Sequence, residues 1–151
     1  MSTLEQRLHD DLTAAIRSRE EVTSATLRMA LTAVKNEAVS GTEARELSDA
    51  DVVAVLGREA KKRREAATAY DEANRPELAD RERAELAVLE GYLPAQLGDD
   101  ELAALVAEAI AETGADSPKQ MGPVMKVLTP KIAGRADGGR VAAAVKAALA
   151  G

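Results

Sequence analysis

A stretch near the end of the chain combines glycines with cations in a way that suits binding to phosphate. It runs from Met121 to Val141 and reads MGPVMKVLTPKIAGRADGGRV, with four Lys or Arg residues against a single acid. Backbone N–H groups at the start of a helix and the guanidinium group of arginine both donate hydrogen bonds to phosphate oxygens. The residues that offer this chemistry are Gly122, Lys126, Lys131, Arg135, Gly138 and Arg140.

Gly122 needs a separate explanation because it lies about one turn inside a predicted helix. Glycine at such a position costs about 1 kcal/mol relative to alanine. We therefore expect either a neighbouring helix or the backbone of a ligand to approach Gly122 closely. Gly138 and Gly139 have a simpler alternative role, which is to turn the chain where the last helix begins. Asp137 is the predicted N-cap of that helix and would compete with a ligand for its backbone donors.

The charge of the chain is distributed unevenly. The net charge is −6 overall, but from Ser117 to the end six Lys or Arg residues oppose one acid, which gives +5. Residues 1–116 hold 14 basic and 25 acidic side chains, which gives −11. The asymmetry indicates a negatively charged partner for the C-terminal part.

A second group of cations lies within a long predicted helix and offers an alternative surface for phosphate. It consists of Arg58, Lys61, Lys62, Arg63 and Arg64. Glu59 and Glu65 stand four residues from Arg63 and Lys61, at a spacing that forms ion pairs along a helix. We therefore interpret this group as a solvated face rather than a binding site.

The sequence predicts no catalytic residue, no cofactor and no metal site. There is no cysteine, and the single histidine, His9, would need convergent partners to act as a base or a metal ligand, so we interpret it as an ordinary exposed residue. The motifs of phosphate loops, nucleophile elbows, zinc proteases and dinucleotide-binding folds are all missing. The lack of cysteine, of an apolar leader and of a long apolar run predicts a cytoplasmic protein with no membrane partner.

Seven helices and no strand follow from the apolar periodicity. Leu4, Leu8, Leu12 and Ile16 recur every four residues in the first helix, and Leu78 and Leu86 supply apolar positions in the fourth. With no Phe or Trp and 32 Ala, the core must be built from aliphatic side chains in closely packed helices. The first predicted helix runs from Ser2 to near Arg19, and the second follows a charged break at Glu20 and Glu21 and is ended by Gly41. The other predicted helices run from Ser48 to about Ala73, from Pro76 to Gly91, from about Asp99 to Gly114, from Ser117 to Pro130, where proline should kink or end the helix, and from Asp137 onward.

The segment GYLPAQLGDD, which begins at Gly91, separates two periodic regions with glycine and proline. We therefore predict an all-α protein of two domains, with four helices in residues 1–93 and three in residues 94–151. The second domain is small enough to be marginal for a core of its own. We expect the second domain either to pack against the first domain or to be loosely attached to it.

Together, these motifs make the chain similar to the GatB/YqeY family. The resemblance covers essentially the whole chain and rests on LRMALTAVKNEA from Leu27, KKRREAATAY from Lys61, YLPAQL from Tyr92, and MGPVM with GRADGGRV near the end. The family usually has a pattern like MGKVMG, so Pro123 replaces its lysine and Lys126 its second glycine. Lys126 supplies a cation about one turn after position 123, where the lysine of the family pattern is missing.

The resemblance implies a helical N-terminal domain and a small helical domain similar to the tail of the GatB protein of the transfer RNA (tRNA)-dependent amidotransferases. That tail helps to hold tRNA, so the six residues named first become RNA-binding candidates, with tRNA as partner and no DNA expected. Amidotransferase or synthetase subunits are the implied protein partners. The glutamine-dependent carbon–nitrogen ligase chemistry belongs to domains that this chain lacks.

Three functions stay open at this point. The leading hypothesis is a tRNA-binding or tRNA-amidotransferase-associated module that is not catalytic by itself. The second is an accessory subunit of a tRNA-dependent amidotransferase, whose activity would need partner subunits. The third is a helical bundle that binds proteins and has no RNA role, which the acidic first domain favours.

Overall fold

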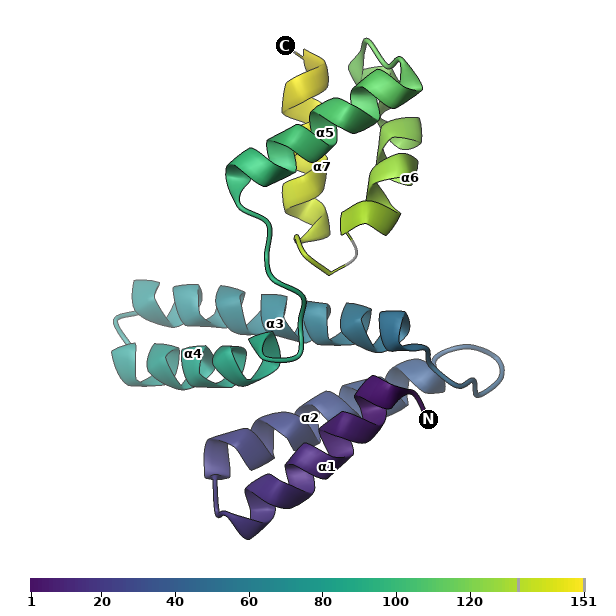
Figure 1. The fold of residues 1–151 in the computed structure, drawn as a ribbon. Coiled ribbons are helices and arrows are strands. Elements are labelled where there is room, and N and C mark those ends of the chain that lie inside the picture. The colour runs from purple at the N-terminus through teal and green to yellow at the C-terminus, as the bar shows by residue number, and fades with distance from the viewer. Residues whose placement is uncertain (133, 151) are drawn as a thin grey trace. The chain divides into compact units, whose positions relative to one another are not determined.

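The structure, a computed structural model, describes residues 1–132 and 134–150, and these residues form helices and no strand (Figure 1). The all-α prediction is confirmed. The helices are α1 (Thr3–Arg17), α2 (Glu21–Ala38), α3 (Asp49–Glu72), α4 (Pro76–Glu90), α5 (Asp99–Thr113), α6 (Met121–Ile132) and α7 (Gly138–Ala150), with a 3₁₀ turn η1 (Pro118–Gln120) before α6. Contacts divide the chain into two compact units, unit 1 (Met1–Leu93) and unit 2 (Pro94–Gly151).

Helix starts follow the capping residues of the sequence. The Ser2 hydroxyl accepts a hydrogen bond from the backbone N–H of Glu5 at 3.1 Å, and α1 begins at Thr3, directly after Ser2. At α3 the hydroxyl of Ser48 accepts from the N–H of Asp51 at 3.1 Å, while the Asp51 carboxylate accepts from the Ser48 N–H at 3.0 Å. The bond from the Ser48 N–H, followed by the Ser48 side chain, holds the pKa of the Asp51 carboxyl below its usual value. Local sequence alone therefore sets where these helices begin.

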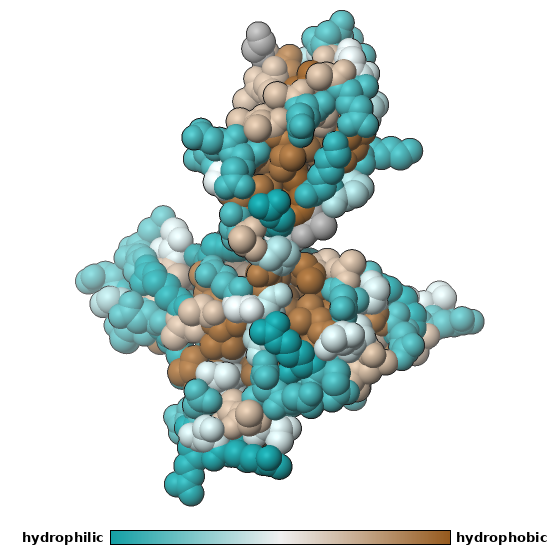
Figure 2. All heavy atoms as spheres, in the orientation of Figure 1, coloured by the Kyte–Doolittle hydropathy of each residue, from teal (hydrophilic) through white to brown (hydrophobic). Residues whose placement is uncertain are grey.

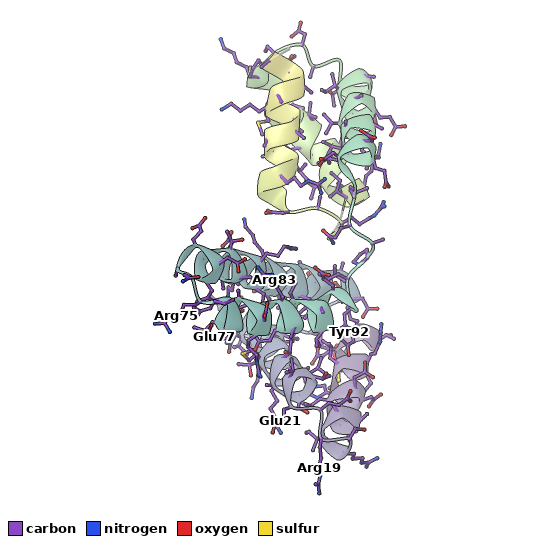
Figure 3. All side chains as sticks on the ribbon, turned by 90° about the vertical axis from the view of Figure 1, so that its left-hand side faces the viewer. Arg19, Glu21, Arg75, Glu77, Arg83 and Tyr92 are labelled. Carbon is purple, nitrogen blue, oxygen red and sulfur yellow. The ribbon has the colours of Figure 1, made fainter. Side chains whose placement is uncertain are left out.

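Unit 1 consists of two helical hairpins, and each turn uses a residue in the left-handed conformation. Arg19 has φ 58° after α1 and Asn74 has φ 59° after α3. The next N–H in each turn reaches back to the helix: Glu20 donates to the Ala15 carbonyl at 3.0 Å, closing a Schellman motif. Figure 3 shows Arg19 at the α1–α2 turn with its side chain directed outward.

One apolar cluster to which α1, α2, α3 and α4 all contribute forms the core of unit 1. Its largest fully buried side chains are Leu8, Leu27, Val34, Val52, Leu56 and Leu89. Ile16 and Leu78 belong to the apolar periodicity of the sequence, yet they are 48% and 40% exposed. Both lie in terminal turns, Ile16 at the end of α1 and Leu78 at the start of α4, where a helix has few neighbours.

Tyr92 ties the end of α4 to α1. Its hydroxyl donates to the Asp11 carboxylate at 2.5 Å, and the Arg7 guanidinium lies 4.6 Å from the centre of its ring. Burial, followed by the hydrogen bond to Asp11, raises the pKa of Tyr92 well above its ordinary value. This contact fixes the chain just before the segment that leads to unit 2.

Unit 2 has an apolar core of its own. Its fully buried members come from all three helices, with Val106 in α5, Val124 and Leu128 in α6 and Val145 in α7. Pro130 does not end α6, contrary to one of the two predicted outcomes, because the helix continues to Ile132. Among the described residues, none of the helices combines the length and apolar content that spanning a bilayer requires.

Candidate nucleic-acid interface

Two of the six candidate residues, Arg135 and Arg140, bind the segment that precedes α5. The Arg140 guanidinium donates to the Leu97 carbonyl at 2.7 Å and pairs with the Asp99 carboxylate at 2.6 Å. Nε of Arg135 donates to the Ala95 carbonyl at 3.1 Å. Both guanidinium groups therefore have structural partners within unit 2.

Backbone groups complete this contact. The Leu97 N–H donates to the Arg135 carbonyl at 2.8 Å, and the Gln96 side-chain amide donates to the Gly134 carbonyl at 3.0 Å. Leu97 itself is only 3% exposed and belongs to the core of unit 2. We call this arrangement, residues 95–99 held by residues 134–140, the clasp. It joins the YLPAQL and GRADGGRV motifs, which sequence reasoning treated as separate signals.

The acidic side chains of α5 offset most of the cations of unit 2. Besides the Arg140 pair, Arg135 lies 3.6 Å from the Glu101 carboxylate, and Lys131 lies 3.3 Å from that of Glu112. Residues 94–151 hold six Lys or Arg against seven Asp or Glu, a net charge of −1. The excess of +5 counted from Ser117 is thus cancelled within the folded unit. Any positive surface in unit 2 must be local.

One such local surface runs along η1 and α6, which we call the α6 face. No Asp or Glu occurs between residues 117 and 136. Lys119 and Lys126 are exposed and have no ion-pair partner among the described residues. Gly122 and Pro123 stand between them at spacings of three and four residues, so all four share one side of the helical segment.

Gly122 is open to solvent. An added Cβ at this position would meet no atom within 4 Å. The prediction that a neighbouring helix approaches Gly122 is therefore wrong, and the alternative, approach by a ligand backbone, stays a prediction. Of the six candidates, Gly122 and Lys126 are both exposed and lie on the same face, and Lys126 has no partner among the residues that the structure describes.

Gly138, the remaining candidate, lies at the start of α7 beside an occupied cap. The Asp137 carboxylate accepts from the Gly139 N–H at 2.9 Å, and the Asp137 carbonyl accepts from Val141 at 3.0 Å. Asp137 caps the helix as predicted. A phosphate at this helix start would have to displace that carboxylate.

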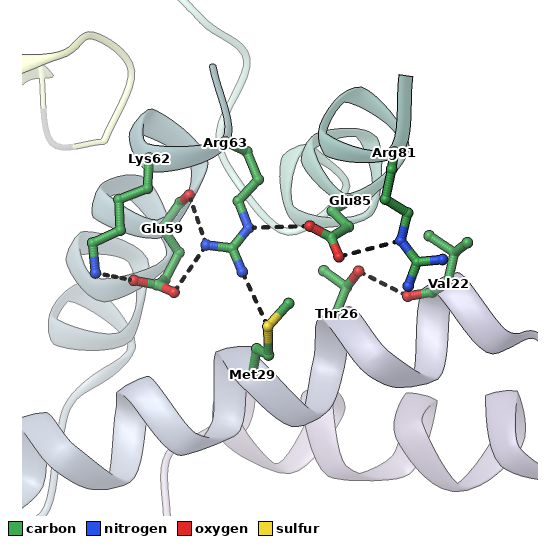
Figure 4. Close-up of polar contacts among 8 residues, drawn as sticks. All are labelled: Val22, Thr26, Met29, Glu59, Lys62, Arg63, Arg81 and Glu85. Carbon is green, nitrogen blue, oxygen red and sulfur yellow. Dashed lines mark hydrogen bonds and ion pairs between the residues drawn. The ribbon is translucent and has the colours of Figure 1, made fainter. Parts of the chain in front are cut away.

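The cationic group on α3 is largely engaged within unit 1, and Arg63 contradicts the prediction of a solvated face. Its side chain is only 10% exposed, in the junction of α2, α3 and α4. It contacts the Glu59 carboxylate at 3.2 Å, the Glu85 carboxylate at 3.8 Å and the Met29 sulfur at 3.5 Å (Figure 4). Sequence spacing predicted the Glu59 pair, but the partners from α2 and α4 depend on tertiary packing.

Three of the four other cations have partners too, and Arg64 has no ion-pair partner among the described residues. Arg58 pairs with Glu37 of α2 at 3.1 Å, Lys62 with Glu59 at 2.9 Å, and Lys61 with Glu65 at 4.0 Å. A polyanion on this part of α3 would have to compete with these carboxylates. The α6 face involves no such competition.

The described residues contain no cluster of three or more His, Asp or Glu side chains with metal-binding geometry. His9 is exposed, as predicted. The geometry therefore defines an all-helical protein of two units, with an internal clasp and a small basic face.

The comparison with known families is consistent with this description. A family model described as Yqey-like protein matches residues 5–149, and the chain belongs to this family. No curated protein matches the chain. The predicted family is thus confirmed over nearly the whole sequence.

Proposed function

We propose that this chain is a tRNA-binding module that is not catalytic by itself and acts with tRNA-amidotransferase or synthetase subunits. The α6 face is the observation that carries the proposal, because its two lysines have no ion-pair partner among residues 1–132 and 134–150 and flank an open glycine. Membership of the Yqey-like family supports it through the resemblance of unit 2 to the amidotransferase tail. Any carbon–nitrogen ligase activity would come from the partner subunits.

Binding at this face follows from its charge and its shape. Lys119 and Lys126 are two turns apart, so their ammonium groups can contact separate phosphates roughly 10 Å apart along the helix. Neither lysine has to break an ion pair with another described residue before it binds a phosphate. The new contact therefore contributes its full electrostatic free energy to binding. Gly122 and Pro123 carry no long side chain, so a ribose-phosphate backbone can come close to α6 between the two lysines.

The test is tRNA binding by the full chain with both lysines reversed in charge. Lys119→Glu combined with Lys126→Glu should weaken binding by about tenfold or more, since each phosphate contact contributes to affinity. The slope of log affinity against log salt should be about −1.4 to −1.8 for the unmodified chain, as expected for two phosphates.

The matched control is Lys61→Glu combined with Lys62→Glu, which changes the charge of the chain equally on α3. We expect it to change tRNA affinity by less than about threefold, through long-range repulsion alone. Abolished binding in this control, with normal binding when Lys119 and Lys126 are changed, would move the RNA surface to α3. Changes at Arg135 or Arg140 are unsuitable because they would open the clasp.

A further inference from the structure

Unit 2 carries an open apolar groove between α5 and α7, with a volume of about 610 Å³. Val106 and Ile110 of α5 form part of its floor, and the ion pair between Asp99 and Arg140 closes one end. The walls are alanines from both helices, namely Ala103, Ala107, Ala111, Ala144 and Ala148. Figure 2 shows apolar residues reaching the surface of this unit beside hydrophilic ones. No residue of α6 lines the groove.

The shape of the groove suits a helix. Its α5 wall has alanine at every fourth position, so a shallow channel follows the helix axis, and small side chains let a second helix approach closely. The exposed residues of α7 also suit a surface for helix packing. From residue 143 onward they are Ala143, Lys146, Ala147, Ala148 and Ala150, so all but one are alanine. A helix that is apolar on nearly every side is typical of one that packs against more than one neighbour.

The rim of the groove is acidic. Along α5, the row next to the groove alanines consists of Asp100, Ala104, Glu108 and Glu112, each four residues from the next and all exposed. Asp100 and Glu108 have no ion-pair partner among the described residues. This rim repels a polyanion and attracts a cationic surface.

We propose that the α5–α7 groove docks an amphipathic helix of a partner protein, with aliphatic side chains on one face and Lys or Arg along its flank. The aliphatic face replaces water over the groove floor, and the basic flank meets Asp100 and Glu108. This inference is independent of the proposed function, because the α6 face contributes no residue to the groove. Unit 2 can then hold RNA and a protein helix at the same time.

The experiment measures binding of a synthetic amphipathic peptide of about 18 residues, or five helical turns, to the full chain. The peptide carries Leu and Ala on one face and Lys on its flanks, and a second peptide has Glu in place of every Lys. The Lys peptide should bind, and the Glu peptide should bind at least about tenfold more weakly. Both affinities are measured by fluorescence anisotropy.

Arginine substitutions at exposed alanines inside and outside the groove test whether the groove is the site. Ala107→Arg fills the groove wall and should weaken binding of the Lys peptide by about tenfold or more, whereas Ala54→Arg adds the same charge to an exposed position of α3 in unit 1 and should weaken it less than about threefold. Ala148→Arg tests the α7 wall in the same way as Ala107→Arg. All three positions are exposed, so circular dichroism should show an unchanged fold.

Several results would overturn the proposal. Failure of the Lys peptide to bind, or equal losses from Ala54→Arg and Ala107→Arg, would show that the groove is not the site. A dimer in sedimentation equilibrium that Ala107→Arg converts to monomer would show that a second copy of the chain occupies it. Changing Lys119 and Lys126 to Glu should leave peptide affinity intact, so failure of RNA binding and failure of helix docking are distinguishable.

Discussion

Two kinds of cation within one basic stretch have different roles in this protein. Arg135 and Arg140 bind backbone carbonyls 40 and 43 residues earlier in the chain, while Lys126 has no partner among the described residues. The planar fork of arginine suits the first role, since one guanidinium can serve a carbonyl and a carboxylate together. Sequence alone placed all three in one class because it shows composition and local spacing but not which distant carbonyls a guanidinium will reach.

Gly122 allows a test that separates stability from binding. Gly122→Ala should raise the free energy of unfolding by roughly 0.5 to 1 kcal/mol, because alanine favours the helix and the new Cβ meets open space. The same change should weaken tRNA binding if RNA approaches the α6 backbone. Urea denaturation and a binding titration on the same variant measure the two effects.

Gly57, inside α3, is the matched control for that substitution. A Cβ there would also meet no atom within 4 Å, so Gly57→Ala should stabilise the chain similarly. Its tRNA affinity should not change. Equal tRNA affinity for both variants would remove Gly122 from the interface while leaving the helix argument intact.

Arg63 shows how a charged residue can be part of a core. Arg63→Ala should destabilise the chain by about 3 to 5 kcal/mol, because it leaves the buried carboxylates of Glu59 and Glu85 without their shared cation. Lys62→Ala also removes a partner of Glu59, but the Lys62 side chain is 69% exposed, and the cost should stay below about 1 kcal/mol. Equal denaturation midpoints for these two variants would contradict the assigned burial.

At the scale of elements, helices were predictable and contacts between them were not. Ser2, Ser48 and Ser117 mark helix starts because capping depends on residues within one turn, and all three predicted starts are confirmed. The left-handed turn at Arg19 and the clasp were missed. The first lacks the usual glycine, and the second joins segments about 40 residues apart.

The contact between Tyr92 and α1 makes the stability of the fold depend on pH in the alkaline range. The raised pKa of Tyr92 means that the folded state favours the neutral phenol, while the unfolded chain loses this proton near pH 10.0. Tyr92 therefore makes its full contribution to the free energy of unfolding below that pH. The contribution is lost as the pH rises from there toward the pKa that Tyr92 has in the folded state. Unfolding free energy should fall in that range.

Tyr92→Phe isolates this effect from the lysines, which titrate over the same range. The variant lacks the bond to Asp11 and should be less stable than the parent at neutral pH. Its loss of stability between about pH 9 and pH 11.5 should be the smaller of the two. Parallel pH curves in urea denaturation would mean that Tyr92 has no part in the dependence.

For the whole molecule, sequence predicted an all-α chain because its periodicity is helical throughout, and this is confirmed. The distribution of charge in the folded units differs most from what the sequence indicated. Counted by unit, residues 1–93 carry 14 basic and 19 acidic side chains, a net charge of −5, against −1 for residues 94–151. The basic surface is therefore a feature of one helix face rather than of one end of the chain.

The clasp determines where an independent unit 2 can begin. A fragment of residues 94–151 keeps Leu97 in its core and keeps the carbonyl partners of Arg135 and Arg140. We expect it to be helical and to melt cooperatively on its own. A fragment of residues 99–151 has all three helices but loses Leu97, which alone should cost about 2 to 5 kcal/mol, together with the hydrogen bonds of the clasp.

Thermal melts followed by circular dichroism compare the two fragments directly. A unit this small has little stability to spare, so the shorter fragment should be largely unfolded at 25 °C. Leu97→Ala in the longer fragment should lie between them, because it removes the core contact and leaves the backbone of the clasp. Similar melting temperatures for both fragments would show that residues 94–98 are only a linker, and that the bonds of the two arginines to the carbonyls of Ala95 and Leu97 do not stabilise unit 2.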